Sequence, residues 1–314
     1  MISLIIASMT MYAIILLIVA IAGMFSERSG VINIALEGIM IVGGTVGVIV
    51  TYFLPVDLNF ILKILIIVLS SCVSGMIFSL LLGFASIHMK ADQTIGGTAL
   101  NVLGLALAVV IVKVFNNNVG AAQGTTNPSI DIERENLFFE LFGIRFNWFL
   151  IVAIIVLVVS TFVLYKTKFG LQIRACGENP HAADSAGINV AKYRYAGVLI
   201  SGALAGLGGA IFCIISSSRF TSSAGVAGYG FLALAVMIFG QWKPTRIAFA
   251  AFFFSFFKAL SSVYSEIPFL ANLGLSKNIY DMLPFIACLI ILAVSSKNSK
   301  APKAAGIPYD KGLR

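Results

Sequence analysis

Long apolar runs alternate with short polar connections along almost the whole chain. A helix that crosses the hydrocarbon core of a bilayer takes about 20 residues, most of them apolar. Eight runs have roughly that length, and a ninth, Gly228–Gly240, has only 13 residues and is bounded by glycine. Alone, a run that short is typical of a re-entrant or interfacial piece. The long runs are Ile2–Phe25, Val31–Leu54, Phe60–Ile87, Thr94–Phe115, Trp148–Tyr165, Tyr195–Ser217, Ile247–Val263 and Tyr280–Ser296.

Basic residues indicate how these runs cross a membrane. Lys and Arg concentrate in the middle loop, 166–194, and in the tail, 297–314, and such clusters face the cytoplasm. Both clusters can lie on one side only if Gly228–Gly240 also crosses. The pattern therefore predicts an all-α, polytopic transmembrane helix bundle of about nine spans, with the N-terminus outside and the C-terminus cytoplasmic. Aromatic residues near the span ends, Trp242 among them, are expected in the interfacial belt.

Composition agrees with a membrane protein. Hydrophobic residues make up 59% and charged residues 11% of the chain, whereas soluble domains carry roughly 25% charged residues. The net charge of +8 is attributed to the cytoplasmic face and not to nucleic-acid binding, because no basic patch has interleaved aromatic residues. We expect one transmembrane domain, 1–296, with 166–194 as a cytoplasmic loop, and a basic tail, 297–314, that is poorly ordered.

The largest segment expected outside the membrane is Asn116–Asn147. Its second part carries apolar residues at helical spacing, which predicts a short interfacial helix. Those residues are Leu137, Phe138, Leu141 and Phe142.

Sequence signatures of catalysis and metal binding are missing. There is no P-loop for nucleotide phosphates, no nucleophile elbow and no His/Cys ligand cluster, and the chain has only two histidines. The four cysteines have no disulfide or metal spacing and are expected to be packing residues. A membrane-bound enzyme is therefore disfavoured, and no catalytic residue, metal or cofactor is expected on this chain. If transport consumes ATP, another polypeptide must hydrolyse it.

Two polar stripes interrupt the apolar runs. Asn33 and Glu37 are one helical turn apart and point the same way. The second stripe, at the start of the fourth run, consists of Gln93, Thr94, Thr98 and Asn101. Each stripe is a candidate lining for a substrate path, and hydrogen bonding between helices is the alternative. Neither carries enough charge to select an ion, so an uncharged polar solute is the expected cargo.

Small residues indicate where helices approach closely. Gly202, Gly206 and Gly209 lie in the segment LISGALAGLGGA and allow tight packing against a neighbouring helix, with a hinge as the alternative. GIMIVGG (Gly38–Gly44) and AVMIFG (Ala235–Gly240) share a spaced Met-Ile-x-Gly pattern on spans expected to run in opposite directions. An inverted repeat produces this kind of similarity, and so does chance.

The middle-loop segment RACGENPHAADSAG specifies a helix of about two turns over Pro180–Ala186. Asn179 is a good N-cap, Pro180 suits the first helical position and Gly187 can take the left-handed conformation after the last turn. A helix this short is marginal in water, so it must dock against a surface. We interpret it as a coupling helix seated in a cleft of an ATP-binding subunit; a loop helix lying on the protein's own base is the alternative. The candidate coupling residues are Asn179, Pro180, His181, Ala182, Ala183, Asp184 and Gly187.

Four segments carry a family pattern: FSERSGVINIALEGIM (Phe25–Met40), KADQTIGGTALN (Lys90–Asn101), GLQIRACGENPHAADSAGINVAKYRYAGVLISGALAGLGGA (Gly170–Ala210) and GYGFLALAVMIFGQWKP (Gly228–Pro244). They look like the permease subunits of bacterial ABC importers for nucleosides, the shorter of the two paralogous permeases. A wider relationship to simple-sugar and branched-chain amino-acid permeases is expected, and NIALEG favours nucleosides over those.

The resemblance implies a subunit of the bacterial cytoplasmic membrane that pairs with a longer sister permease. It also implies ATP-binding subunits, which hold ATP and Mg, on the cytoplasmic side and a lipid-anchored or periplasmic substrate-binding protein outside. Asn179 to Gly187 match the family's coupling segment. The alternatives are a simple-sugar ABC permease and a stand-alone secondary transporter or channel that follows an ion gradient.

Overall fold

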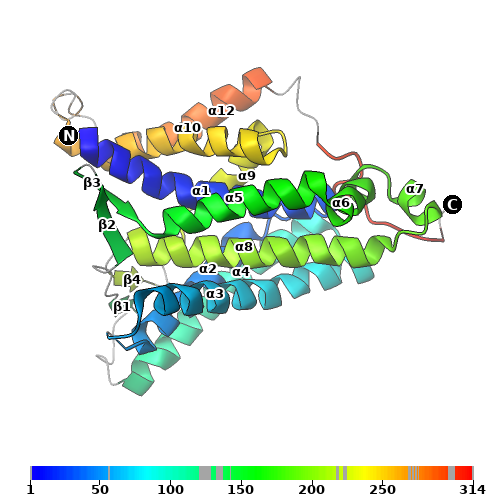
Figure 1. Cartoon of the computed structure of the whole chain (residues 1–314), viewed down its shortest axis with the longest axis horizontal. Coiled ribbons are helices and arrows are strands. Elements are labelled where there is room, and N and C mark those ends of the chain that lie inside the picture. The colour runs from blue at the N-terminus through cyan, green and yellow to red at the C-terminus, as the bar shows by residue number, and fades with distance from the viewer. Residues whose placement is uncertain are drawn as a thin grey trace.

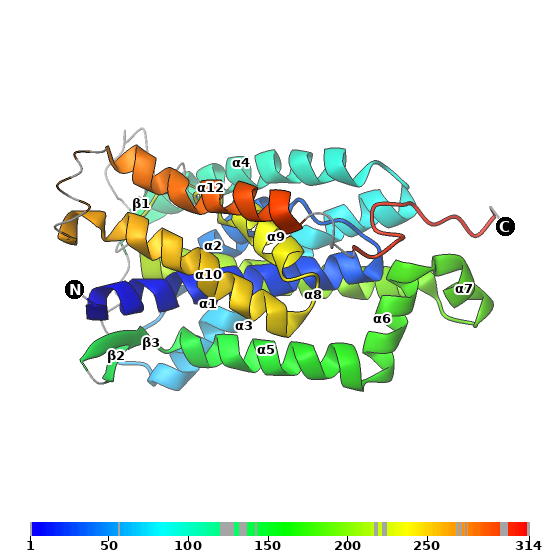
Figure 2. The same ribbon diagram turned by 90° about the horizontal axis from the view of Figure 1, so that it is seen from above.

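Long helices dominate the structure, a computed structural model of the whole chain. They run side by side along one axis, with the N-terminus at one end and the C-terminus, α6 (Lys168–Glu178) and α7 (Pro180–Ser185) at the other (Figure 1 and Figure 2). We call these the N-terminal end and the α7 end. The structure describes residues 2–55, 57–119, 129–131, 137–141, 143–216, 219–221, 225–267, 270, 272, 274, 276–295 and 301–312.

Six helices in the described residues are long and apolar enough to cross a membrane, which confirms the expected bundle of membrane-spanning helices. They are α1 (Ile2–Ser29), α2 (Leu36–Phe53), α3 (Phe60–Gly83, continued by a π-helical turn at Phe84–His88), α4 (Gln93–Val119), α5 (Phe149–Lys166) and α8 (Val190–Ser216). A shorter apolar helix, α9 (Tyr229–Phe239), occupies the glycine-bounded run. α10 (Pro244–Ser262) and α12 (Lys277–Ser295) have 19 residues each, and a 3₁₀ turn at Tyr264–Glu266 follows α10.

α8 packs against α1, α2 and α3 at the centre of the bundle. The backbones come so close that a Cβ added to Gly43 of α2 would lie 2.6 Å from the carbonyl oxygen of Gly206, and one added to Gly75 of α3 would lie 2.8 Å from the Cα of Gly206. Gly209 meets the backbone of α2, and Gly202 meets that of α3. Small residues give membrane helices this kind of contact.

In the described residues, short strands lie at the N-terminal end (Figure 1). β1 (Ser129–Asp131) pairs antiparallel with β4 (Arg219–Thr221), and β2 (Phe138–Leu141) forms an antiparallel hairpin with β3 (Ile144–Asn147). The first pair joins the segment after α4 to the segment after α8.

The β2–β3 hairpin stands where the spacing predicts an interfacial helix, so that prediction is wrong. Gly143 has a φ of +72°, which lets the chain reverse tightly, and the rings of Phe139 and Phe146 stack across the hairpin at 5.9 Å. Over so few residues, apolar positions suit either element, and periodicity alone cannot decide between them. Phe142, one of the residues used for that prediction, lies outside the described residues.

The expectation of a poorly ordered tail is wrong for residues 301–312. The backbone amide of Ala304 donates to the carbonyl of Gly177 at 2.9 Å, and that of Gly306 donates to the carbonyl of Gly30 at 3.3 Å. Backbone groups held in this way fix the segment against the bundle, and no periodicity in the sequence reports them. The remaining tail residues, 297–300 and 313–314, lie outside the described residues.

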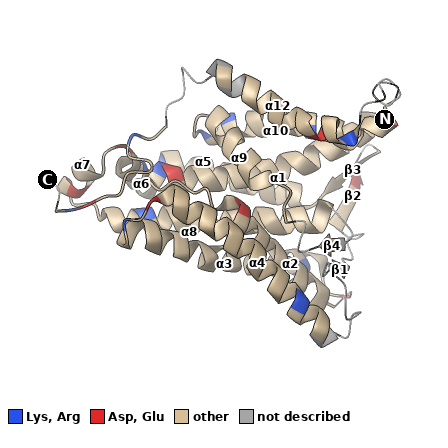
Figure 3. Cartoon of the chain, turned by 180° about the vertical axis from the view of Figure 1, so that it is seen from behind, with Lys and Arg blue, Asp and Glu red and all other residues tan. Residues whose placement is uncertain are grey.

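Charged residues are sparse along the helices. Figure 3 shows them mostly toward the two ends of the bundle, including the region of α6 and α7. Basic residues near the α7 end are Lys166, Lys168, Arg174 and Lys192.

Candidate functional site

Side chains at the end of α1 hold the turn that leads into α2. Ser26 Oγ donates to the carbonyl of Val31 at 2.7 Å, and Ser29 Oγ donates to the carbonyl of Ser26 at 2.7 Å. Gly30, with a φ of +100°, lets the chain reverse between them. The turn places the start of α2 inside the bundle, where most residues of the two predicted stripes meet.

Glu37 caps the short helix α9 from across the bundle. The N-cap residue of α9 is Gly228, which has no side chain that could accept a hydrogen bond. Instead, Glu37 Oε1 accepts from the amide of Gly228 at 2.8 Å, and Oε2 accepts from the amide of Gly230 at 2.6 Å. A carboxylate is favourable there because it satisfies free amides at the positive end of the helix dipole. The structure therefore places Glu37 at the contact of α2 with α9, with both oxygens bonded.

Two side-chain amides fasten the start of α2 to α4. Asn101 Oδ1 accepts from the amide of Gly38 at 2.7 Å, and its Nδ2 donates to the carbonyl of Ile34 at 3.0 Å. Gln93 Oε1 accepts from the amide of Ile32 at 2.7 Å. These bonds fix the position of the first turn of α2, from which Glu37 projects.

Two buried amide atoms in this region have no hydrogen-bond partner among the described residues: Asn33 Oδ1 and Gln93 Nε2. Asn33 is fully buried, and its Nδ2 donates to Ser201 Oγ of α8 at 2.8 Å. A buried polar atom gains free energy when it finds a partner. These two atoms are therefore the unpaired buried polar groups of the two stripes in the described part of the chain.

Thr94 and Thr98 lie apart from this group, on the exposed face of α4. Thr98 Oγ1 donates to the carbonyl of Thr94 within the same helix, at 3.0 Å. On that face Ile95 and Val102 are 70% and 72% exposed. The predicted stripes thus divide in two. The residues that meet around the start of α2 are Asn33, Glu37, Gln93 and Asn101.

A second polar contact ties the end of α1 to the turn after α9. Trp242 Nε1 donates to Glu27 Oε2 at 2.6 Å, and Arg28 Nε and Nη2 donate to the carbonyl of Trp242 at 3.2 and 3.1 Å. Arg28 also lies 3.6 Å from Glu178 at the end of α6. Trp242 is only 4% exposed, so its predicted place in an interfacial aromatic belt is wrong. It is buried because its indole N–H has a partner inside the protein.

The predicted two-turn helix is present as α7, at the end of the molecule opposite the N-terminus (Figure 2). Asn179 Oδ1 accepts from the amide of Ala182 at 3.1 Å, and Pro180 occupies the first turn. Gly187 follows the helix with a φ of +81°. These are the capping features that the segment's sequence specifies.

Only part of α7 faces outward. Ala183 is 4% exposed and packs with Cys176 and Val190, and Pro180 is also buried. Burial raises the pKa of the Cys176 thiol to about 11, so this cysteine is an uncharged packing group at neutral pH. The exposed residues between Asn179 and Gly187 are Asn179, His181, Ala182, Ser185, Ala186 and Gly187.

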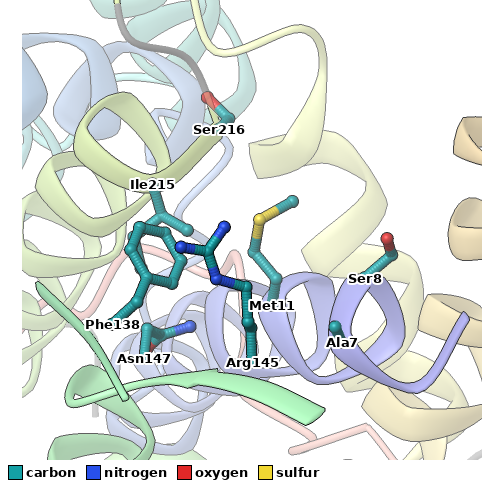
Figure 4. Close-up of a pocket in the computed structure, with 8 residues that line it drawn as sticks. All are labelled: Ala7, Ser8, Met11, Phe138, Arg145, Asn147, Ile215 and Ser216. Carbon is teal, nitrogen blue, oxygen red and sulfur yellow. The ribbon is translucent and has the colours of Figure 1, made fainter. Parts of the chain in front are cut away.

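A cavity of about 390 Å³ opens at the N-terminal end. Figure 4 shows that its walls come from α1, from the β2–β3 hairpin and from the end of α8. Asn147 is 3% exposed, and its Oδ1 has no hydrogen-bond partner in the part of the chain that the structure describes. The polar and aromatic lining residues are Ser8, Phe138, Arg145, Asn147 and Ser216. This combination can hold a small polar solute, and no pattern in the sequence predicted it.

A family model described as the permease component of the branched-chain amino acid transport system matches residues 5–294, from α1 into α12. The chain belongs to this family. It is a multi-pass membrane permease of an ABC transporter, a transport component and not an enzyme.

Curated relatives match the permease along nearly its full length. The guanosine ABC transporter permease protein NupQ of Bacillus subtilis (strain 168) is 38% identical over 320 residues, covering 99% of this chain and 98% of the relative. The nucleoside ABC transporter permease protein NupC of Lactococcus lactis subsp. cremoris (strain MG1363) is 36% identical over 311 residues, with 98% and 96% covered. The nucleoside ABC transporter permease protein NupB of the same strain is 27% identical over 315 residues, with 95% and 83% covered. No solved structure matches the chain.

The contact around Trp242 was not predicted from the sequence of the permease, although one signal was present. Glu27 and Arg28 stand at the end of an apolar run, and a charged side chain near the membrane is costly unless it is paired. The partner could not be named from sequence, because Trp242 follows Glu27 by 215 positions.

Proposed function

We propose that this permease forms the translocation pathway for nucleosides in an ATP-driven importer. The observation that carries the proposal is the near full-length identity, 38% and 36%, to two permeases named for guanosine and for nucleosides. An uncharged polar cargo also suits the group around the start of α2, where the groups with unpaired buried atoms are the amides of Asn33 and Gln93. Asn33, Glu37, Gln93 and Asn101 are proposed to lie beside the substrate path.

In this proposal the α7 end is cytoplasmic and the N-terminus is outside. Support comes from the basic residues near α7, since short cytoplasmic loops of membrane proteins are enriched in Lys and Arg. The tail 301–312 lies at the same end.

Nine crossings, including α9, follow from this orientation. The chain leaves β4 at the N-terminal end, starts α9 beside Glu37 and reaches Trp242 next to the end of α1. The stretch from β4 through α9 would therefore cross the membrane as one discontinuous span. Broken helices whose N-termini meet a polar group are typical of transporter binding regions. The opposite directions of α2 and α9 support the inverted repeat of Gly38–Gly44 and Ala235–Gly240.

α7 is the proposed entry point for motion driven by ATP. Its exposed residues His181, Ala182 and Ser185 would sit in a cleft of an ATP-binding subunit, which holds ATP and Mg. From α7, contacts lead through Glu178 to Arg28 at the end of α1 and on to Trp242, which directly follows α9. The other end of α9 meets Glu37, so a displacement of α7 has a continuous route to the substrate path. Closure of the ATP-binding subunits would move α7, and the bundle would release its cargo inward.

A longer sister permease and a substrate-binding lipoprotein complete the proposed importer. The lactococcal strain has two permeases named for nucleosides, and this chain covers less of the more distant one, NupB, than of NupC. The exposed face of α4 offers an apolar surface for the sister chain, and Thr94 and Thr98 would line the path where the two permeases meet. The binding protein would deliver cargo at the N-terminal end, beside the cavity lined by Asn147.

Reconstitution tests the proposed function. The tagged chain is purified from its native membrane in mild detergent, and the proteins that accompany it are identified by mass spectrometry. The complex is placed in proteoliposomes, and uptake of labelled guanosine, ribose and leucine is measured with and without ATP. We expect ATP-dependent guanosine uptake that other nucleosides inhibit. Uptake of ribose or leucine instead would refute the proposal that nucleosides are the cargo. Uptake by the chain alone along an ion gradient would refute the proposal that transport is driven by ATP.

A further inference from the structure

Residues 301–312 cross the α7 end of the bundle beside α6 and α7, drawn in red in Figure 1. We call this segment the strap. We propose that the strap ties α7 to the ends of the membrane-spanning helices and transmits the displacement of α7 to them. The proposal rests on the coupling function proposed for α7 and gives the tail a positioning role of its own.

Backbone hydrogen bonds fix the middle of the strap to the body of the protein. The amide of Ala304 bonds to the carbonyl of Gly177 in α6 at 2.9 Å, and the amide of Gly306 bonds to the carbonyl of Gly30 at the end of α1 at 3.3 Å. Gly306 has a φ of +81°, and a Cβ there would lie 2.7 Å from the side chain of Ile32. The strap is therefore shaped to the turn between α1 and α2.

Arg194 of α8 holds the strap from the bundle side. Its side chain is fully buried, at 1% exposed, and Nη1 donates to the carbonyl of Ile307 at 3.0 Å. Nε and Nη2 are buried and have no hydrogen-bond partner in the described part of the chain. Because a buried guanidinium is costly to leave without partners, the bond to Ile307 favours the docked position of the strap.

The last part of the strap reaches α7 itself. The rings of Tyr309 and His181 meet edge-on, with their centroids 5.2 Å apart. Lys311 Nζ lies 3.7 Å from Asp184 Oδ1. Both contacts are with side chains of α7, on the helix proposed to receive the ATP-binding subunit.

Between these contacts, the strap is joined to the connection of α3 with α4. Asp310 Oδ2 accepts from Lys90 Nζ at 2.6 Å, and Asp310 Oδ1 accepts from the amide of Gly312 at 3.0 Å. These bonds, led by the one from Lys90, lower the pKa of Asp310, so its carboxylate is charged at neutral pH. Through the strap, α7 is linked to α1, α8 and the ends of α3 and α4.

Apart from the route through Glu178 and Arg28, α7 has few contacts that could pass on a displacement. It has six residues, and its buried contacts are mainly those of Pro180 and Ala183. Flexing at Asn179 and at the connection after Gly187 would absorb a push on so short a helix. Packed side chains and networks of hydrogen bonds and ion pairs carry energetic coupling between sites, and the strap supplies a second attachment of this kind that runs to the helices around the substrate path.

Hydrogen exchange of the full chain in detergent tests whether the strap holds α7 in place, and it requires no transport measurement. Relative to wild type, Asp310→Lys should speed exchange of the α7 amides about threefold, the scale of one exposed ion pair. Lys90→Asp should do the same, since its positive φ of 52° is tolerated by Asp. The double variant restores the pair with reversed polarity and should return to within about twofold of wild type. Exposed Lys303→Ala is the matched control and should change nothing.

A chain that ends at Lys300 removes every strap contact and should speed α7 exchange by about tenfold or more. Unchanged α7 exchange in both this chain and Asp310→Lys would refute the proposal that the strap holds α7 in place. Faster exchange that the double variant fails to reverse would also overturn the assigned role of the Lys90 pair.

The assembled importer tests transmission through the ratio of nucleoside imported to ATP hydrolysed. The single variants should keep their ATP-binding subunits and import about threefold less per ATP, and the double variant should recover. A normal ratio with faster α7 exchange would refute transmission, and loss of the ATP-binding subunits would replace it with a docking role for the strap. If the wild-type complex imports no nucleoside, the proposed function fails while the exchange result on the strap stands.

Discussion

Replacing Glu37 by alanine is the change that should most directly release α9. This helix starts at Gly228 without a capping side chain of its own, and the two oxygens of Glu37 accept from the amides of Gly228 and Gly230. The alanine variant leaves both donors, which lie in partly buried positions, without these acceptors. Each such group costs about 1–3 kcal/mol, so the free energy of unfolding should fall by about 2–6 kcal/mol.

Glu37→Gln separates hydrogen bonding from charge. The glutamine keeps one acceptor oxygen, but its NH₂ group faces the second backbone N–H, which leaves one donor unpaired. We expect a loss of about 1–3 kcal/mol, roughly half of the alanine effect. The exposed Glu266→Gln is the matched control and should stay within about 0.5 kcal/mol of wild type.

The assay is denaturant unfolding of the purified chain in detergent, combined with hydrogen exchange at the first turn of α9. The Glu37 variants should exchange faster there than wild type. A loss below about 0.5 kcal/mol in Glu37→Ala, the range of an ordinary surface substitution, would refute the capping argument. A large loss without faster exchange in α9 would show that Glu37 stabilises a different part of the bundle.

Three further changes test other parts of the structure. Ala182→Arg, on the exposed side of α7, should abolish ATP-dependent uptake and leave the unfolding midpoint unchanged. Ala183→Arg, at a buried site, should abolish uptake and also lower the unfolding midpoint. Normal uptake in Ala182→Arg would contradict the coupling role of α7. Gly206→Ala should lower the midpoint because of the backbones of Gly43 and Gly75, whereas Gly96→Ala, with nothing within 4 Å, should be neutral or stabilising. Lys90 lowers the pKa of Asp310, so the stabilisation by this pair is present above the ordinary carboxyl pKa and is lost as pH falls through the lowered pKa. The difference in unfolding midpoint between wild type and Asp310→Asn should therefore shrink on acidification below about pH 4. A difference that stays constant with pH would argue against the ion pair.

Local physics explains which features of this permease could be predicted from its sequence. Apolar runs must be long enough to cross the hydrocarbon core, so their length predicts the spanning helices. The caps of α7 act within a few residues of each other, and Asn179, Pro180 and Gly187 predict its position without any tertiary information. The hairpin at Phe138–Asn147 escaped prediction because its apolar pattern is too short to distinguish a strand from a helix.

The sequence by itself determined that this chain is a multi-span bundle with a capped helix in its middle loop, since both depend on interactions between near neighbours. Only the tertiary structure decided what the polar groups do. Glu37 meets Gly228 at a separation of 191 positions, Glu27 meets Trp242 at 215, and Lys90 meets Asp310 at 220. Pairs so far apart leave no periodic trace in the sequence. They depend on how the helices pack together in the bundle, with α8 against α1, α2 and α3.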